Sequence, residues 1–441
     1  YRSAMASAAL SEGKPMSRCP GMEQSDPGRG RGAQAPRYGP RYGRPHRRDR
    51  SQEEKRSGPE HDAELDRVFD LWERFQDVLG PWKSRYLDTA ESFLSCGIFE
   101  KGFSLFRCES CGHSLRVAFS CKTRLCPSCV RKRMTQWSDW LSQEVLLELP
   151  HRHWVFTLPQ ELRRHFVKKR WLLNKLSNTA ARVLMRQMSV RCPEAFCVPG
   201  VIVVIQTAGD ALTFNPHAHI IATTQCLGPS GRLHKVPYIP YVKLSRIWKS
   251  AVLYLLKNTK CITREEMDVL WKRYPNGFNL NGEIKDTVRD REASKRLSEY
   301  LVRPAMAEYR ITNFNRESHT VRFKGRGAKD RKTGRRPRII RSMDSVEFTA
   351  RLLAQTPPKG QKLVNYYGIY SNKVRGMWKK VGFKLRRLKR KKQRHASKLG
   401  WRSQLWRIYE VDPLRCPDCL QDLTLIDLVF PPESSILAQP P

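Results

Sequence analysis

The sequence predicts an α+β fold in which helices flank a central antiparallel β-sheet, preceded by a small zinc-binding domain. Two apolar runs, VIVVIQ at 201–206 and HAHIIAT at 217–223, have the pattern of strands, and the segment between them is turn-like. An antiparallel hairpin at the centre of a sheet follows from that pairing. Residues at helical spacing lie on both sides of the hairpin. Two C-x-x-C pairs precede it, and closely spaced cysteine pairs are typical of zinc sites.

The size and charge of the chain indicate a polyanionic partner. The chain has 441 residues, a formal net charge of +40 and a pI of about 10.2. A positive field of this size attracts nucleic acid, and an anionic membrane is the alternative. We find no apolar run of the ~18 residues that span a bilayer and no apolar signal-peptide core. We therefore expect a cytoplasmic protein that binds nucleic acid, with no membrane partner and no small-molecule substrate.

Composition and motifs divide the sequence into four parts. Residues 1–60 are rich in Gly, Pro, Arg and Ser, which is typical of a disordered basic extension. Residues 61–150 are the predicted zinc-binding domain, with a helix expected at 61–80. Residues 151–402 are the predicted catalytic domain. Residues 403–441 are a C-terminal tail with one more C-x-x-C pair.

Periodicity predicts the other elements. Apolar residues at helical spacing indicate helices, and a short apolar run closed by a proline indicates a strand. In chain order we expect a helix at 131–148, a strand at 153–158, a long amphipathic helix at 161–190, a mostly helical region at 240–302, a basic β-hairpin at 310–340 and a helix-rich basic region at 346–395.

The cysteine-rich segment fits a tetrahedral zinc site. It contains CESC at 108–111 and CKTRLCPSC at 121–129, so 14 residues separate the two C-x-x-C pairs. Four thiolates make a structural site, because no coordination position stays open. The predicted ligands are Cys108, Cys111, Cys126 and Cys129.

Further metal donors lie outside this set. Cys121 and His113 are spare donors that could replace a ligand or bind a second ion. The pair Cys416 and Cys419 has no partner pair nearby in the sequence, so metal binding there needs distant donors.

A histidine pair is the candidate catalytic metal site. Side chains alternate along a strand, so His217 and His219 share one face, about 7 Å apart. Two such imidazoles can converge on one divalent cation, which neutralises charge on a scissile phosphate. Gln206, on the neighbouring predicted strand, is a candidate third donor. From this triplet alone, packed or exposed histidines remain the alternative.

A tyrosine on a predicted helix is the candidate nucleophile. Tyr300 lies on a helix expected at about 288–303, and Arg303 follows close to the same helix face. A phenol is a weak nucleophile and benefits from nearby metal or basic groups. The alternative is that Tyr300 only packs at the edge of the core. Competing nucleophiles, for which core or base-stacking roles are expected, are Tyr366, Tyr367 and Tyr370.

Five segments in this order resemble the IS91-type family of transposases, within the larger class of HUH (His, hydrophobic, His) endonucleases. They are FRCESCGHSLRVAFSCKTRLCPSC with HRHWVFTLP, then IQTAGDALTFNPHAHIIAT, SEYLVRPAMAEYRITN, LVNYYGIYSNKVRG and YEVDPLRCPDC. The resemblance runs from about residue 65 to 430.

The resemblance implies a rolling-circle transposase with an HUH-type catalytic domain. His217 and His219 then bind Mg²⁺ or Mn²⁺, and Tyr300 nicks and rejoins single-stranded DNA at transposon ends and target through a 5′-phosphotyrosine. Zn²⁺ is structural, and the protein acts at the bacterial nucleoid. Pro304 stands where many members have a second tyrosine, which makes this a single-tyrosine variant. The rival hypothesis is a non-catalytic zinc-ribbon nucleic-acid-binding protein or an inactive transposase remnant.

Basic runs are the candidate DNA-binding surface. Residues 321–341 contain ten Lys or Arg and one acid, and residues 373–402 contain no acid. Aromatic side chains interleaved with them, Phe323, Trp378 and Phe383, suggest base stacking beside phosphate contacts. The residues predicted to contact DNA are Arg303, Lys324, Arg326, Arg335, Arg336, Arg386, Arg387 and Lys391.

Overall fold

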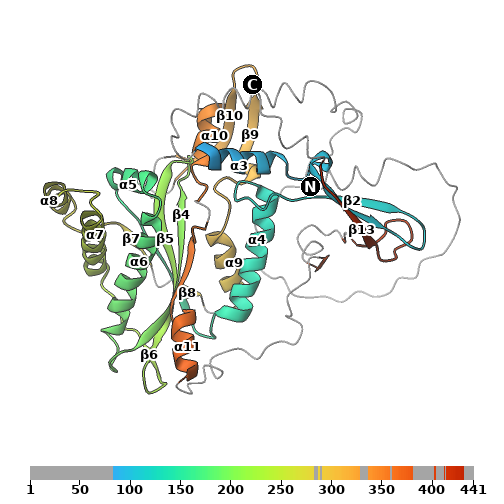
Figure 1. Cartoon of the computed structure of the whole chain (residues 1–441). Coiled ribbons are helices and arrows are strands. Elements are labelled where there is room, and N and C mark those ends of the chain that lie inside the picture. The colour runs from blue at the N-terminus through green and yellow to red at the C-terminus, as the bar shows by residue number, and fades with distance from the viewer. Residues whose placement is uncertain are drawn as a thin grey trace, which may run out of the picture. The chain divides into compact units, whose positions relative to one another are not determined.

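The computed structural model describes residues 83–282, 287–288, 291–327, 336–357, 360–380, 402–403, 412 and 414–431 (Figure 1). The expected basic extension at 1–60 and helix at 61–80 lie outside the described residues. The chain divides into two compact units, and all described residues belong to the larger one. Within the described parts of the chain, no helix combines the length and apolar character needed to cross a membrane.

A seven-stranded antiparallel sheet forms the centre of the fold. Its main path runs β12 (Val364–Gly368), β4 (Val198–Ala208), β5 (Phe214–Leu227), β3 (His151–Phe156) and β7 (Leu280–Asn281). Strand β6 (Leu233–Lys235) pairs with β5, and β8 (Thr287–Val288) pairs with β3. The predicted hairpin is confirmed as β4 and β5, with the turn closed by Gly209 N–H donating to the Thr213 carbonyl.

Helices cover both faces of this sheet, because both faces of its central strands are apolar. On β4, Val201 and Val203 face a core shared with α6 (Leu172–Ser189) and α7 (Tyr241–Asn258). On the opposite face, Ile202 and Val204 contribute to a second core. That core includes residues of the π-helical turn η4 (Leu141–Val145) after α4 (Pro127–Trp140), and of α9 (Arg291–Leu301) (Figure 1). Burial of each such side chain contributes about 1.5–3 kcal/mol.

The helix expected at 161–190 is divided. A 3₁₀ turn (Gln160–Leu162) and α5 (Arg163–Lys168) come first, and α6 starts at Leu172. Arg170 lies in the break and is buried, with its guanidinium donating to the Ala354 carbonyl at 2.6 Å and stacking over Phe214. A buried cation needs such partners. The contacts of Arg170 therefore account for the break between α5 and α6, although the helical spacing of apolar residues continues through it.

The region expected to be helix-rich, 346–395, contains a strand. Helices α10 (Ser345–Leu353) and α11 (Asn372–Lys380) fit the expectation, but β12 between them pairs with β4. Strand β12 has the sequence VNYYG, and its β-branched and aromatic residues, Val364, Tyr366 and Tyr367, favour a strand over a helix. Helix α8 (Arg264–Arg273) follows α7 and starts with a capping box at Thr263.

A small three-stranded sheet holds the cysteine-rich segment. After α3 (Lys83–Leu94) and a 3₁₀ turn (Phe99–Lys101), β1 (Phe103–Arg107) pairs with β2 (Ser114–Ala118). The third strand, β13 (Thr424–Val429), pairs with β1 from the far end of the sequence. The residues assigned from sequence to a separate C-terminal tail, 403–441, therefore contribute a strand to this sheet.

A second three-stranded sheet carries many basic residues. It consists of β9 (Ile311–Asn315), β10 (Thr320–Arg326) and β11 (Arg338–Asp344) in the order β11-β10-β9, after a 3₁₀ turn (Glu308–Arg310). This confirms the predicted basic β-hairpin and adds a strand to it. Phe323 is fully buried here with Phe348, so the prediction that Phe323 stacks on bases is wrong.

Candidate active site and metal centres

The predicted histidine pair lies on β5 in the middle of the central sheet. His219 is opposite Val204 on one side and Val155 on the other, and His217 is opposite Gln206. The two histidines share the face covered by α9, because Ile221, two residues further on, belongs to the same buried core as Leu301 of α9. The rings lie 4.8 Å apart between centroids.

Both imidazoles are in the form that binds metal. Burial lowers the pKa of His217, and burial with neighbouring His217 and His153 lowers the pKa of His219 to about 2. Both rings are therefore neutral at pH 7. The His217 Nδ1 lies 2.6 Å from the Asn215 carbonyl, to which it donates, so its Nε2 keeps a lone pair. The buried Nε2 of His219 has no hydrogen-bond partner among the described residues. These donors fit a divalent cation.

A third histidine, missed from the sequence, completes this group. His153 lies on β3, and its Nε2 is 3.0 Å from the His219 Nδ1. The two rings are stacked, with centroids 5.2 Å apart. The signal was present in the sequence: His151 and His153 form a second H-x-H pattern on the strand next to β5.

Tyr300 lies against the histidines. Its ring stands edge-on to His219, with centroids 5.8 Å apart, and to His153, at 6.5 Å. The residue is 42% exposed, so Tyr300 is accessible from solvent. Arg303 stacks over the Tyr300 ring at 4.2 Å, with a guanidinium nitrogen 3.5 Å from the hydroxyl. The structure thus brings together the histidine pair, the tyrosine and the arginine that the sequence singled out.

The competing tyrosines have structural partners. Trp137 Nε1 donates to the Tyr366 hydroxyl at 3.0 Å, and the Tyr367 hydroxyl lies 3.0 Å from that of Ser177. Tyr370 is fully buried beside His151, and burial raises its pKa. A buried phenol with a raised pKa is a poor nucleophile. These contacts favour the core roles expected for the three residues.

Helix α9 is held in place by both the sheet and α4. Gln206, the candidate third metal ligand, donates a hydrogen bond from its Nε2 to the Leu301 carbonyl at 2.7 Å, which leaves its Oε1 as the atom that could bind a metal. Lys295 forms an ion pair with Asp139 on α4 at 3.3 Å. Helix α9, which carries Tyr300, therefore contacts both the central sheet and α4.

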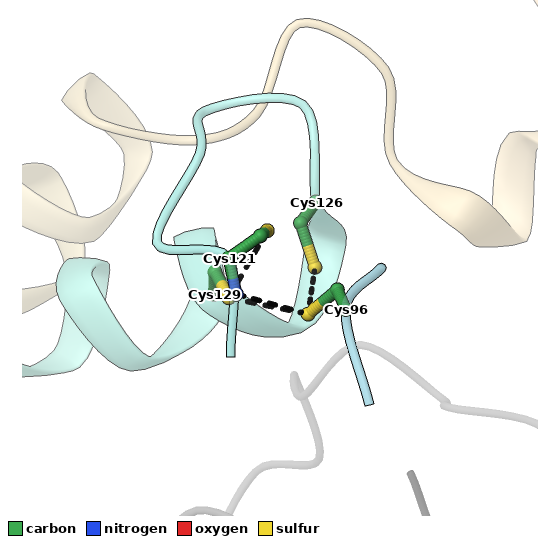
Figure 2. Close-up of side chains that lie close together, drawn as sticks. All are labelled: Cys96, Cys121, Cys126 and Cys129. Carbon is green, nitrogen blue, oxygen red and sulfur yellow. Dashed lines mark hydrogen bonds between the residues drawn. The ribbon is translucent and has the colours of Figure 1, made fainter. Parts of the chain in front are cut away.

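The N-terminus of α4 belongs to a cluster of four thiols, shown in Figure 2. Sγ–Sγ distances are 3.6 Å for Cys96–Cys126, 3.8 Å for Cys96–Cys129 and 3.7 Å for Cys121–Cys129. Zinc bonds of ~2.3 Å in tetrahedral geometry give an edge of about 3.8 Å, whereas a disulfide is ~2.05 Å. This first cluster fits zinc. Cys96 was not singled out from sequence, since it stands alone after α3.

A second cluster consists of Cys108, Cys111, Cys416 and Cys419. The four thiols predicted to share one site are therefore divided between two clusters. The reason is geometric. Cys108 and Cys111 flank the turn between β1 and β2, whereas Cys121 follows the opposite end of that hairpin. Five residues of strand separate the two ends by about 17 Å. His113, predicted as a spare donor, pairs with Asp418 at 2.8 Å.

Some predicted DNA-contacting residues lie on the basic sheet. Lys324 and Arg326 are exposed on β10, and Arg336 is exposed two residues before β11. Asp210, in the turn before β5, accepts from Arg310, which ties the basic sheet to the strand with the histidines. Exposed aromatic rings that the sequence analysis missed are Tyr309 and Phe314. Outside the described residues, at least for their side chains, lie Arg335, Trp378, Phe383, Arg386, Arg387 and Lys391.

The fold and the site define an α+β protein that has thiol clusters suited to zinc and a tyrosine beside a pair of buried, neutral histidines. A family model described as a transposase zinc-binding domain matches residues 68–158, and one described as a putative transposase matches residues 200–377. With the curated relatives described below, these matches show that the chain is similar to the IS91-type transposases over most of its length. It is therefore a transposase, a class of enzyme that cuts and joins DNA.

Two curated relatives agree with this assignment. The chain is 26% identical over 347 residues to the transposase for insertion sequence element IS801 of Pseudomonas savastanoi pv. phaseolicola, covering 76% of this chain and 81% of the relative. It is 26% identical over 345 residues to the putative transposase y4qJ of Sinorhizobium fredii (strain NBRC 101917 / NGR234), covering 73% and 82%. No solved structure matches the chain.

Proposed function

We propose that this transposase nicks and rejoins single-stranded DNA through Tyr300, by the rolling-circle route, at transposon ends and target sites in the bacterial cytoplasm. The observation that carries the proposal is the placement of Tyr300: a partly exposed phenol, edge-on to His219 and capped by a guanidinium.

The chemistry is a transesterification. The Tyr300 Oη attacks phosphorus, the bond to the 3′ oxygen breaks, and the products are a 5′-phosphotyrosine and a free 3′-hydroxyl. Attack by a 3′-hydroxyl on the phosphotyrosine reverses the step, so rejoining needs no ATP. Arg303 is placed to stabilise charge on the tyrosine oxygen or the phosphate. His217 and His219 would hold Mg²⁺ or Mn²⁺, which neutralises phosphate charge when bound.

A single strand suits the described surface. Lys324, Arg326 and Arg336 provide phosphate contacts, and Tyr309 and Phe314 present exposed rings for bases. Base–aromatic stacking needs bases that are free of a duplex, and contributes about 1–3 kcal/mol for each base. Tyr309 and Phe314 lie in or beside β9, and Lys324 and Arg326 lie in β10, which pairs with it.

The test is a covalent adduct of defined polarity. Purified protein with Mn²⁺ is mixed with a random-sequence pool of single strands labelled at either the 5′ or the 3′ end. Because the 5′ phosphate stays on the protein, only 3′-labelled strands should yield labelled protein in denaturing gels. Labelled protein from 5′-labelled strands contradicts the polarity. No adduct from either pool favours the rival hypothesis of a non-catalytic zinc-ribbon protein or inactive remnant.

A further inference from the structure

The second cysteine cluster lies partly outside everything that the family models match. Cys108 and Cys111 fall within the zinc-binding match at 68–158, but both matched ranges end well before Cys416 and Cys419. The two pairs are more than 300 positions apart, since Cys108 and Cys419 are separated by 311 residue numbers. All four Sγ atoms lie within 4.8 Å of one another.

The sulfur geometry is that of a metal site. The Sγ atoms of Cys108 and Cys419 are 3.4 Å apart, and those of Cys111 and Cys416 are 3.5 Å apart. Both distances are far beyond a disulfide bond of ~2.05 Å and close to the edge of a tetrahedral zinc–thiolate site, about 3.8 Å. Bare thiols gain little from such crowding, whereas a divalent cation offsets the charge of the thiolates.

The two C-x-x-C pairs have the same backbone conformation. In the first, Cys108 N–H donates to the His113 carbonyl and Gly112 N–H donates to the Cys108 carbonyl, at 2.7 and 2.9 Å. In the second, the equivalent bonds join Cys416 to Gln421 and Leu420 to Cys416, at 2.8 and 3.0 Å.

The residue after each second cysteine has a positive φ, 76° at Gly112 and 60° at Leu420. A leucine in this region is strained, by about 1–2 kcal/mol. The second turn is therefore held in the conformation that presents both of its thiols to the first.

The buried apolar surface around this site is too small to hold β13 against β1 by itself. The buried cluster around this site contains Phe106, Leu423 and two of the cysteines themselves. On β13, Leu425, Ile426 and Leu428 are each about half exposed, at 50%, 55% and 47%. Small sheets without a sufficient core depend on a metal or disulfides for stability. His113–Asp418 adds one cross-contact.

We propose that Cys108, Cys111, Cys416 and Cys419 bind a second structural zinc ion that fixes β13 to β1. The zinc-binding sheet is then completed by residues 416–429, so a product truncated before Cys416 lacks an intact module. Four thiolates leave no open position, which makes this ion structural. The inference does not depend on the proposed DNA chemistry.

Metal analysis of the full-length protein tests this site. We expect two zinc ions per chain, and one in the double variant Cys416→Ser/Cys419→Ser. Cys261→Ser, which changes a thiol outside both clusters, is the matched control and should keep both ions. One zinc in the unaltered protein, two zinc ions in the double variant, or iron at this site would overturn the proposal.

Alkylation of the unaltered protein tests the site even if the double variant does not fold. In the zinc-loaded protein, Cys416 and Cys419 should react with iodoacetamide at least tenfold more slowly than after zinc chelation, as read by peptide mass spectrometry. Slow reaction that is restored by zinc supports the proposal. Equal rates with and without zinc would refute it.

Discussion

At the scale of single residues, the feature that matters most is that the imidazoles of His217 and His219 are buried and neutral. The Nε2 of His219 lies buried without a partner among the described residues, while its Nδ1 meets His153 at 3.0 Å. A ligand imidazole is usually oriented through its second nitrogen. We propose that His153 orients His219 in this way, and that Arg303 orients the oxygen of Tyr300.

We predict that His153→Ala lowers the yield of covalent adduct by about 10- to 100-fold, the usual effect of losing the residue that orients a metal ligand. The yield should recover partly as Mn²⁺ is raised, which a purely structural defect would not allow. His319→Asn, which changes an exposed histidine in a loop, is the control. An unchanged Mn²⁺ dependence in His153→Ala would show that His153 does not support the metal site.

Sequence reasoning located residues whose chemistry is local. His217 and His219 share a strand face by simple alternation, and Tyr300 precedes Pro304 on a short helix. Cys96 and His153 could not be assigned in that way, because their partners come from other elements. The number of cysteines in a zinc site could have pointed to Cys96. If Cys416 and Cys419 bind zinc together with Cys108 and Cys111, the other three thiols, those of Cys121, Cys126 and Cys129, need a fourth.

At the scale of elements, helix α4 connects the first cysteine cluster to the nucleophile helix. Cys126 caps α4, Cys129 lies in its first turn, and Asp139 near its end pairs with Lys295 on α9. Tyr300 follows on the same helix α9. We predict that a change at the cluster shifts α4, and through its contacts with α9 also shifts Tyr300.

Removal of zinc should therefore lower the yield of covalent adduct, although it does not alter His217 and His219. We expect protein stripped of zinc by a chelator, then supplied with Mn²⁺, to form adduct at about a tenth or less of the original yield, because small displacements of a nucleophile cost up to ~100-fold. Re-addition of zinc should restore the yield. If the zinc-free protein reacts at the full rate, α4 does not position α9.

The pairing of β12 with β4 depends on a glycine. Gly368 has a φ of +57°, and an added Cβ would lie 1.9 Å from the Pro199 carbonyl oxygen. We predict that Gly368→Ala lowers the free energy of unfolding by about 2 kcal/mol or more, measured by urea denaturation. Gly376→Ala on α11 is the control: its added Cβ meets no described atom within 4 Å, so it should gain about 0.5–1 kcal/mol. Equal stability of the two variants would contradict the close approach.

Elements were predictable where periodicity was unbroken by long-range contacts. The β4–β5 hairpin and the basic hairpin combine alternating patterns with strong turn signals, and both are confirmed. The break at Arg170 and the pairing of β13 with β1 were not predictable, because each depends on a partner about 180 or more positions away. Short-range sequence patterns cannot predict contacts between residues so far apart in the chain.

For the whole molecule, the net charge of +40 implies that binding to DNA releases many counterions. We predict that raising salt from about 50 to 200 mM weakens single-strand binding by about a thousandfold or more. Replacing Lys324, Arg326 and Arg336 by Ala should reduce the slope of log affinity against log salt by about 2, since each phosphate contact contributes ~0.7. The slope is measured by fluorescence anisotropy. An unchanged slope in this variant would show that these three residues do not contact the DNA.

The yield of covalent adduct from Tyr300→Phe shows whether Tyr300 forms the covalent bond to DNA. The phenyl ring remains, so folding, zinc content and strand binding should match the unaltered protein, while the adduct disappears because the nucleophilic oxygen is gone. Tyr366→Phe, which alters only a hydroxyl bound to Trp137, should keep the adduct. A Tyr300→Phe protein that forms adduct in normal yield would contradict the account, and peptide mapping of that adduct would identify the true nucleophile.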